Sequence, residues 1–169
     1  MSAWCPAWLI DLPEAVTIGQ KVVAAVLADA GLTYPIIEVG VTLTDDVTVR
    51  GLNRDYRRED KATNVLSFAG DSAFDLAHKG PLLLGDIVLA HGVMSAEARA
   101  QGKTLHAHYC HLLVHGSLHL LGQDHIDDKG AKEMEAREVA ILTGLGIADP
   151  YQLKGAPADL DQRALLGLK

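Results

Sequence analysis

The chain has 169 residues, of which 49% are hydrophobic and 22% are charged. These fractions are typical of a folded globular domain and exclude an intrinsically disordered chain or a fibrous coiled coil. The formal net charge of −7 argues against a protein that coats nucleic acid through a broad basic surface. Any contact with nucleic acid is therefore expected to be local.

The sequence favours a cytoplasmic location without a membrane partner. No apolar run approaches the roughly 20 residues that a membrane-spanning helix needs. The N-terminal residues lack the positive charge and the apolar stretch of a secretory signal. The two cysteines, Cys5 and Cys110, are expected to remain reduced thiols.

The first half of the chain shows one clear helix and one clear strand. Apolar residues at helical spacing predict a helix over about residues 13–30, with Gly31 as its stop. Alternation of apolar with polar or small residues predicts a half-buried strand over residues 36–44. The acidic pair at residues 45–46 is suited to capping a short second helix.

Two further strands are expected after this helix, over residues 63–69 and 82–90. The second is apolar enough to be buried on both faces, and the polar segment 70–80 between them reads as a loop. A helical turn or two is expected over residues 94–100.

The last third of the chain is predicted to be helical. Thr104 can cap a helix that runs to about Leu121 and stops at Gly122, and a final helix is expected from about residue 127 to Gly144. The order of elements predicts an α+β fold, a small mixed β-sheet packed with about five helices. We expect one domain over residues 1–150 and a loosely ordered C-terminal tail over residues 151–169.

Histidines are concentrated in one stretch of twenty residues: His106, His108, His111, His115, His119 and His125. His115 and His119 are four residues apart, so on a helix both imidazoles can reach one ion. Gly122 allows a sharp turn after the helix, so that His125 can fold back as a third ligand. Three neutral imidazoles with an open fourth position are typical of a catalytic zinc site. The pattern predicts one Zn²⁺ per chain.

The same histidine spacing also occurs in metzincin-type proteases. In those enzymes a glutamate follows the first histidine and acts as general base, whereas Gly116 stands at this position here. Loss of a general base costs about 10²–10⁴ in rate. A metalloprotease-like peptide hydrolase therefore remains an alternative, as does a non-catalytic zinc protein associated with the ribosome.

The segment from His115 to His125 resembles the signature of the YbeY family of metal-dependent, single-strand-specific endoribonucleases. The other matching segments are Leu52-Asn53 with Tyr56-Arg57, Thr63 to Phe68, Leu84 to Ile87, and the two histidines His108 and His111. Together they cover about residues 39–142. The chain departs from the family at Gln123, where tyrosine is usual, and at Ala69, where proline is common.

This resemblance implies a zinc ion bound by His115, His119 and His125, in a cleft between a central helix and the sheet. It also implies that Arg57 is the functionally sensitive basic residue, so that these four residues form the expected catalytic set. The implied activity is cleavage of single-stranded RNA in rRNA processing at the 16S 3′ end and in ribosome quality control. The expected partners are rRNA precursors and the ribosome or its proteins, and not DNA.

Three residues are expected to support the site. His111 lies one turn before His115 and is a candidate partner of a ligand, a proton shuttle or a buried histidine. Asp86 lies in an apolar strand, where a carboxylate needs a partner, so we expect it to orient a ligand or brace the sheet. Asp124 adjoins His125 and is expected to orient it or to cap the turn. Cys110 points about 140° away from the ligand face and is expected in the core.

Overall fold

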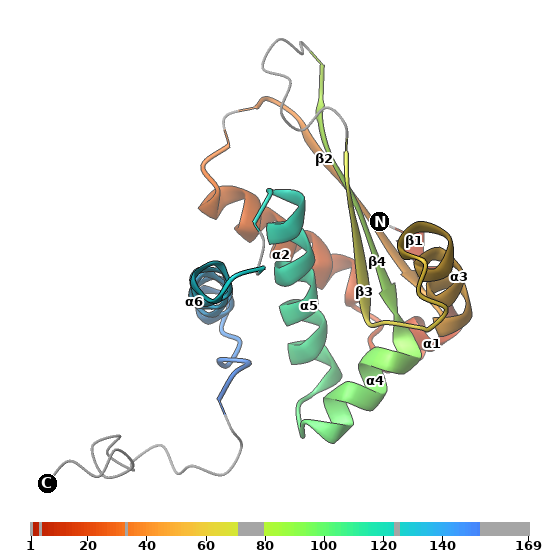
Figure 1. The fold of residues 1–169 in the computed structure, drawn as a ribbon. Coiled ribbons are helices and arrows are strands. Elements are labelled where there is room, and N and C mark those ends of the chain that lie inside the picture. The colour runs from red at the N-terminus through yellow and green to blue at the C-terminus, as the bar shows by residue number, and fades with distance from the viewer. Residues whose placement is uncertain (1, 4, 33, 71–79, 124–125, 153–169) are drawn as a thin grey trace, which may run out of the picture.

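The computed structural model describes residues 2–3, 5–32, 34–70, 80–123 and 126–152. Helices and strands are mixed along the chain, and the last three elements are all helices (Figure 1). The elements are β1 (Ser2–Ala3), α1 (Pro6–Asp11), α2 (Ala15–Asp29), β2 (Ile37–Thr44), α3 (Asp46–Arg57), β3 (Val65–Ala69), β4 (Leu82–Ala90), α4 (His91–Ala100), α5 (Leu105–Leu120) and α6 (Asp128–Gly144). The predicted α+β fold is confirmed.

The four strands form one mixed sheet in the order β1-β2-β4-β3. Strands β1, β2 and β4 run parallel to one another, and β3 is an edge strand that pairs antiparallel with β4. The pairing of β2 with β4 shifts register at Gly85, whose φ is 132°. A Cβ added to Gly85 would lie 2.0 Å from the Phe68 carbonyl oxygen, so only glycine fits this irregularity.

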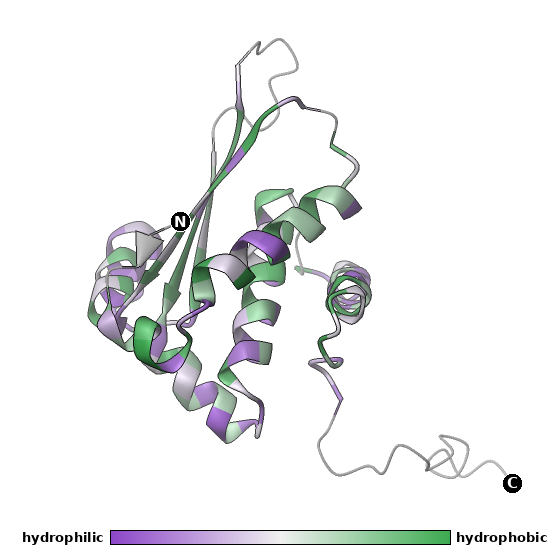
Figure 2. Cartoon of the chain, turned by 180° about the vertical axis from the view of Figure 1, so that it is seen from behind, coloured by the Kyte–Doolittle hydropathy of each residue, from purple (hydrophilic) through white to green (hydrophobic). Residues whose placement is uncertain are grey.

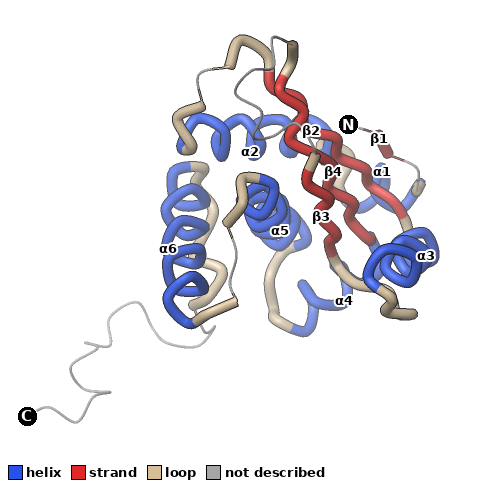
Figure 3. The backbone as a smooth tube through the Cα atoms, turned by 45° about the horizontal axis from the view of Figure 1, so that its top comes forward, coloured by secondary structure: helices blue, strands red, loops and turns tan. Residues whose placement is uncertain are grey.

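Helices cover both faces of the sheet. Leu66 and Val88 pack with Val49 of α3, whereas Gly116 of α5 faces Ile87. Since successive side chains of a strand point to opposite faces, α3 and α5 lie on opposite sides of the sheet. In Figures 1 and 3, α6 lies on the far side of α5 from the sheet, so α5 is the central helix.

The core contains buried polar groups that are hydrogen-bonded across elements. Trp8 of α1 is fully buried, and its Nε1–H donates to the Thr44 carbonyl at 3.0 Å. The Tyr109 hydroxyl of α5 donates to the Ala15 carbonyl at 2.8 Å. Figure 2 shows apolar segments on the strands and on α5, with hydrophilic segments distributed over the helices.

Several element boundaries differ from the sequence predictions. The structure adds α1 and β1, which were not predicted, and α4 begins at His91 instead of residue 94. Tyr151, expected at the start of a loose tail, contacts His111 and Glu138, and residues 153–169 lie outside the described part of the chain. Among the described residues, none of the helices is long and apolar enough to span a bilayer.

Candidate metal centre

Helix α5 ends in a turn that returns the chain toward its own last histidine. Thr104 caps the start of the helix, as predicted. At the other end Gly122 has a φ of 83°, and the Gln123 N–H donates to the Leu118 carbonyl at 3.0 Å. This left-handed ending is a Schellman motif, which glycine adopts without strain. The turn places the Gln123 carbonyl beside the ring of His119.

The rings of His115 and His119 turn their Nε2 atoms toward each other at 3.0 Å. His115 donates its Nδ1–H to Glu138 Oε1 at 2.7 Å, and His119 donates its Nδ1–H to the Gln123 carbonyl at 2.9 Å. Both partners are acceptors, so each neutral ring carries its proton on Nδ1 and a lone pair on Nε2. Two lone pairs at this distance repel each other unless a proton or a cation lies between them.

This geometry fits a metal ion. Tetrahedral zinc, with Zn–N bonds of about 2.0–2.1 Å, separates two ligand nitrogens by about 3.3 Å. Among the described residues, no group of three metal-binding side chains is present. His125, the third predicted ligand, and Asp124 lie outside the described residues, so their roles stay predictions.

Glu138 of α6 is the buried carboxylate behind His115. Its side chain is 1% exposed and accepts hydrogen bonds from His111 Nε2–H at 2.9 Å, from His115, and from the Tyr151 hydroxyl. Burial alone would raise the pKa of this carboxyl, but the three hydrogen bonds outweigh burial and hold the pKa at about 2. Glu138 is therefore an ionised acceptor that links α5, α6 and the segment after α6.

Sequence reasoning did not find Glu138 or Tyr151. The available signal was spacing: Met134, Glu138 and Leu142 are four residues apart, and all three are buried on one face of α6. A glutamate on the apolar face of an amphipathic helix requires a partner. The sequence alone did not show which residue supplies it.

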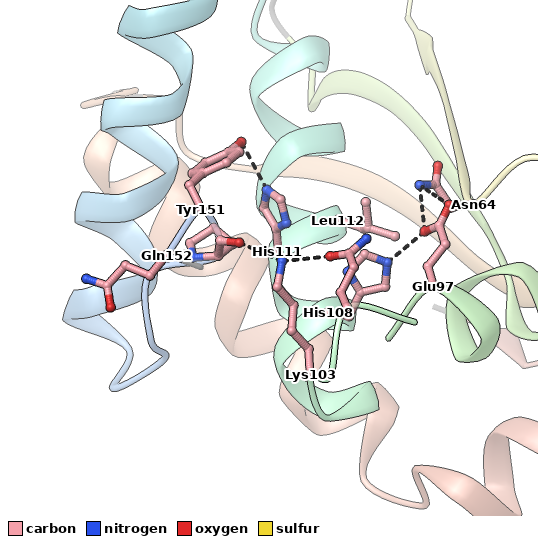
Figure 4. Close-up of a pocket in the computed structure, with 10 residues that line it drawn as sticks. Asn64, Glu97, Lys103, His108, His111, Leu112, Tyr151 and Gln152 are labelled. Atoms are coloured by element: carbon pink, nitrogen blue, oxygen red, sulfur yellow. Dashed lines mark hydrogen bonds and ion pairs between the residues drawn. The ribbon is translucent and has the colours of Figure 1, made fainter. Parts of the chain in front are cut away.

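His111, predicted to support the site, also lines a neighbouring cavity of about 520 Å³. Figure 4 shows the Tyr151 hydroxyl reaching His111 on one side of this cavity and the pair His108–Glu97 on the other. His108 Nε2 lies 2.7 Å from Glu97, which also accepts from Asn64. Burial lowers the pKa of His108 despite the neighbouring carboxylate. His111 lines this cavity and shares Glu138 with His115, so the cavity adjoins the candidate metal centre.

Arg57 and Asp86 lie apart from the histidines. Arg57 is exposed in the last turn of α3, on the face of the sheet opposite α5. The expectation that Asp86 is buried is wrong: it is exposed, and its carboxylate lies over Gly40 on the α3 side of the sheet. From that side it cannot orient a ligand carried by α5.

The described partners of the ligand histidines come from α6 and from the turn after α5, and not from the sheet. These contacts hold the Nδ1 side of each ring, so the Nε2 atoms, which would bind the ion, point away from Glu138 and from the Gln123 carbonyl. The position of the metal in a cleft between α5 and the sheet stays a prediction. Gly116 occupies the side of α5 that faces the sheet. A Cβ at Gly116 would lie 3.0 Å from Ser67 Oγ and 3.2 Å from Ile87 Cγ2.

Comparison with known proteins agrees with the resemblance seen in the sequence. The family model described as endoribonuclease YbeY matches residues 9–146. A relative from Paramagnetospirillum magneticum, named endoribonuclease YbeY, is 50% identical over 149 residues, which cover 87% of this chain and 91% of the relative. A second relative of that name, from Sphingopyxis alaskensis, is 50% identical over 150 residues, covering 85% of this chain and 88% of the relative.

Among solved structures, the solution structure of a Thermotoga maritima protein matches with a TM-score of 0.47 at 20% identity, covering 83% of this chain and 91% of that one. The family model spans most of the chain, and the two relatives are each 50% identical to this chain over about nine tenths of their own length. The chain belongs to the endoribonuclease YbeY family.

Proposed function

We propose that this chain is a zinc-dependent endoribonuclease that cuts single-stranded RNA in the cytoplasm. The proposed substrates are rRNA precursors, with roles in processing the 16S 3′ end and in ribosome quality control, in association with the ribosome or its proteins. The names of the curated relatives support the endoribonuclease activity. The zinc ion, the rRNA substrates and the cellular location are parts of this proposal that the names do not state.

The observation that carries the metal assignment is the 3.0 Å approach of the His115 and His119 Nε2 atoms. The Nδ1–H of each ring is hydrogen-bonded to an acceptor, so the Nε2 lone pairs of both rings are directed to one point. The Schellman turn at Gly122 supports His125 as the third ligand, because it ends α5 three residues before His125. When bound, zinc would supply a water of lowered pKa or polarise a phosphoryl oxygen.

Arg57 is the proposed phosphate contact. Within the described residues Arg57 has no hydrogen bond or salt bridge, whereas Arg50 pairs with Asp60 and Arg54 with Asp55. A guanidinium whose N–H groups make none of these contacts has its donors available for bidentate hydrogen bonds to a phosphate. An RNA strand that touches both Arg57 and the histidines would pass the edge strand β3.

Tyr56 strengthens the case for RNA along this path. It is 70% exposed and lies edge-on to Phe68 of β3, with ring centroids 5.2 Å apart. Single-stranded nucleic acids stack their bases on exposed aromatic rings, and their phosphates bind to nearby basic side chains such as arginine. This local patch reconciles RNA binding with a net charge of −7.

The test compares His119→Ala with His106→Ala. Both remove an imidazole from α5, but only His119 faces His115. We expect His119→Ala to lose bound zinc and cleavage of a single-stranded RNA oligonucleotide, and His106→Ala to retain both. Chelation should abolish cleavage by the parent, and added zinc should restore it. A folded, zinc-free His119→Ala protein that cleaves at the parent rate would contradict the proposal.

A further inference from the structure

Glu138 is held in one orientation by groups from two different segments. Its Oε2 accepts from His111 Nε2–H at 2.9 Å and from the Tyr151 hydroxyl, whereas its Oε1 accepts from His115 Nδ1–H at 2.7 Å. Two donors on one oxygen fix the plane of the carboxylate. The other oxygen is therefore aimed at His115.

This arrangement does more than satisfy a buried charge. A buried carboxylate needs donors, and hydroxyls or amides of any kind would serve. Here one of the donors is the ring whose opposite nitrogen meets His119 at 3.0 Å. An acceptor at Nδ1 fixes the tautomer and the tilt of a metal-binding imidazole and raises the basicity of its other nitrogen.

Tyr151 is part of the same hydrogen-bonded group. Burial and the adjacent Glu138 carboxylate raise the pKa of Tyr151, so the hydroxyl remains a donor. Its ring also lies edge-on to His111, with centroids 5.3 Å apart. The segment after α6 is thereby tied to α5 through the Glu138 carboxylate.

We propose that Glu138 is a positioning residue for metal binding, which locks His115 in the Nδ1–H tautomer with Nε2 directed at the ion, and that Tyr151 holds Glu138 in that role. The inference rests on the proposed zinc site. It adds two residues that do not touch the ion but set its affinity.

The experiment measures zinc affinity by competition with a chromophoric chelator. Glu138→Gln keeps the shape of the side chain, but its amide cannot accept from all three donors. We expect zinc binding to weaken about 10- to 100-fold in Glu138→Gln, and to weaken less in Tyr151→Phe. The matched control is Glu133→Gln, the same change at an exposed position of α6, which should bind zinc as the parent does.

A second readout is the tautomer of His115 in the zinc-free protein, followed by nitrogen NMR. The parent should show the proton on Nδ1, and Glu138→Gln should move it to Nε2 in a measurable share of molecules. Unchanged zinc affinity and an unchanged tautomer in Glu138→Gln would overturn the proposal, even if the variant were less stable. If Glu138→Gln does not fold, Tyr151→Phe is the test. An unchanged zinc affinity in Tyr151→Phe overturns the proposed role of Tyr151. An unchanged His115 signal in Tyr151→Phe overturns the proposed influence of Tyr151 on the His115 ring.

These outcomes separate the two proposals. A parent protein that binds no zinc refutes the proposed zinc site, and the His115 tautomer in the zinc-free protein still tests the positioning role. A parent that binds zinc, with a Glu138→Gln variant that binds it equally well, leaves the metal site intact and refutes the positioning role alone.

Discussion

The residue after His115 distinguishes this site from a protease site. Gly116→Glu would complete the local motif of a zinc protease, in which that glutamate is the general base. In this fold, however, a Cβ at Gly116 would lie 3.0 Å from Ser67 Oγ and 3.2 Å from Ile87 Cγ2. The new carboxylate would enter the contact between α5 and the sheet instead of reaching the histidines.

The expected change in the free energy of unfolding follows from these contacts. Gly116→Ala gains about 0.5–1 kcal/mol of helix propensity, which offsets the small shift that the tight Cβ contacts require. We therefore expect its free energy of unfolding to lie within about 1 kcal/mol of the parent. Gly116→Glu adds overpacking of about 1–3 kcal/mol and the burial of a carboxylate without a partner. A total of about 3 kcal/mol would lower the Tm of a domain of this size by roughly 6–12 °C.

The assay is thermal unfolding of the parent, Gly116→Ala and Gly116→Glu, with zinc-dependent casein hydrolysis measured in parallel. We expect the alanine variant to unfold near the parent temperature, the glutamate variant to unfold well below it, and all three to leave casein intact. A glutamate variant as stable as the parent would show that this side of α5 does not pack on the sheet. Casein hydrolysis by that variant would show that the position faces the metal.

Two further predictions concern side chains away from this contact. Arg57→Ala should keep zinc and Tm but lower kcat/KM on RNA about 10- to 100-fold, as expected for a charge-assisted hydrogen bond of about 1.5–3 kcal/mol. Arg54→Ala, which removes an exposed arginine already paired with Asp55, is its control, and loss of zinc in Arg57→Ala would make Arg57 structural. Cys110 is 1% exposed, and burial raises its pKa to about 11. A thiol reagent should therefore modify only Cys5 in the folded protein and both cysteines after unfolding; rapid modification of both in the native state would refute this.

The elements that sequence reasoning predicted are those with a repeated pattern of apolar residues. The predicted helix over 13–30 is α2, Ala15–Asp29, and the predicted strand over 36–44 is β2, Ile37–Thr44. The capped helix from Thr104 to about Leu121 is α5. In each case burial of one face imposes a period that the sequence must show.

The features that were missed lack such a period or depend on distant partners. Helix α1 has six residues, too few for a helical repeat, and is fixed by the burial of Trp8. The exposure of Asp86 depends on how far α3 extends over the sheet, which strand composition does not reveal. The role of Glu138 depends on α6 packing beside α5, and a contact over 23 residues of sequence leaves no local pattern.

Spacing along α5 does not by itself identify the ligand pair. His111 and His115 are four residues apart, like His115 and His119, yet their ring centroids lie 6.4 Å apart, whereas those of His115 and His119 lie 4.5 Å apart. The difference comes from the acceptors. Glu138 lies between His111 and His115 and draws one nitrogen of each ring toward itself, whereas Gln123 draws only the far nitrogen of His119. Helix α5 therefore carries two histidine pairs with the same spacing. The fold, through the buried Glu138 carboxylate and the Gln123 carbonyl, turns only the Nε2 atoms of His115 and His119 toward each other.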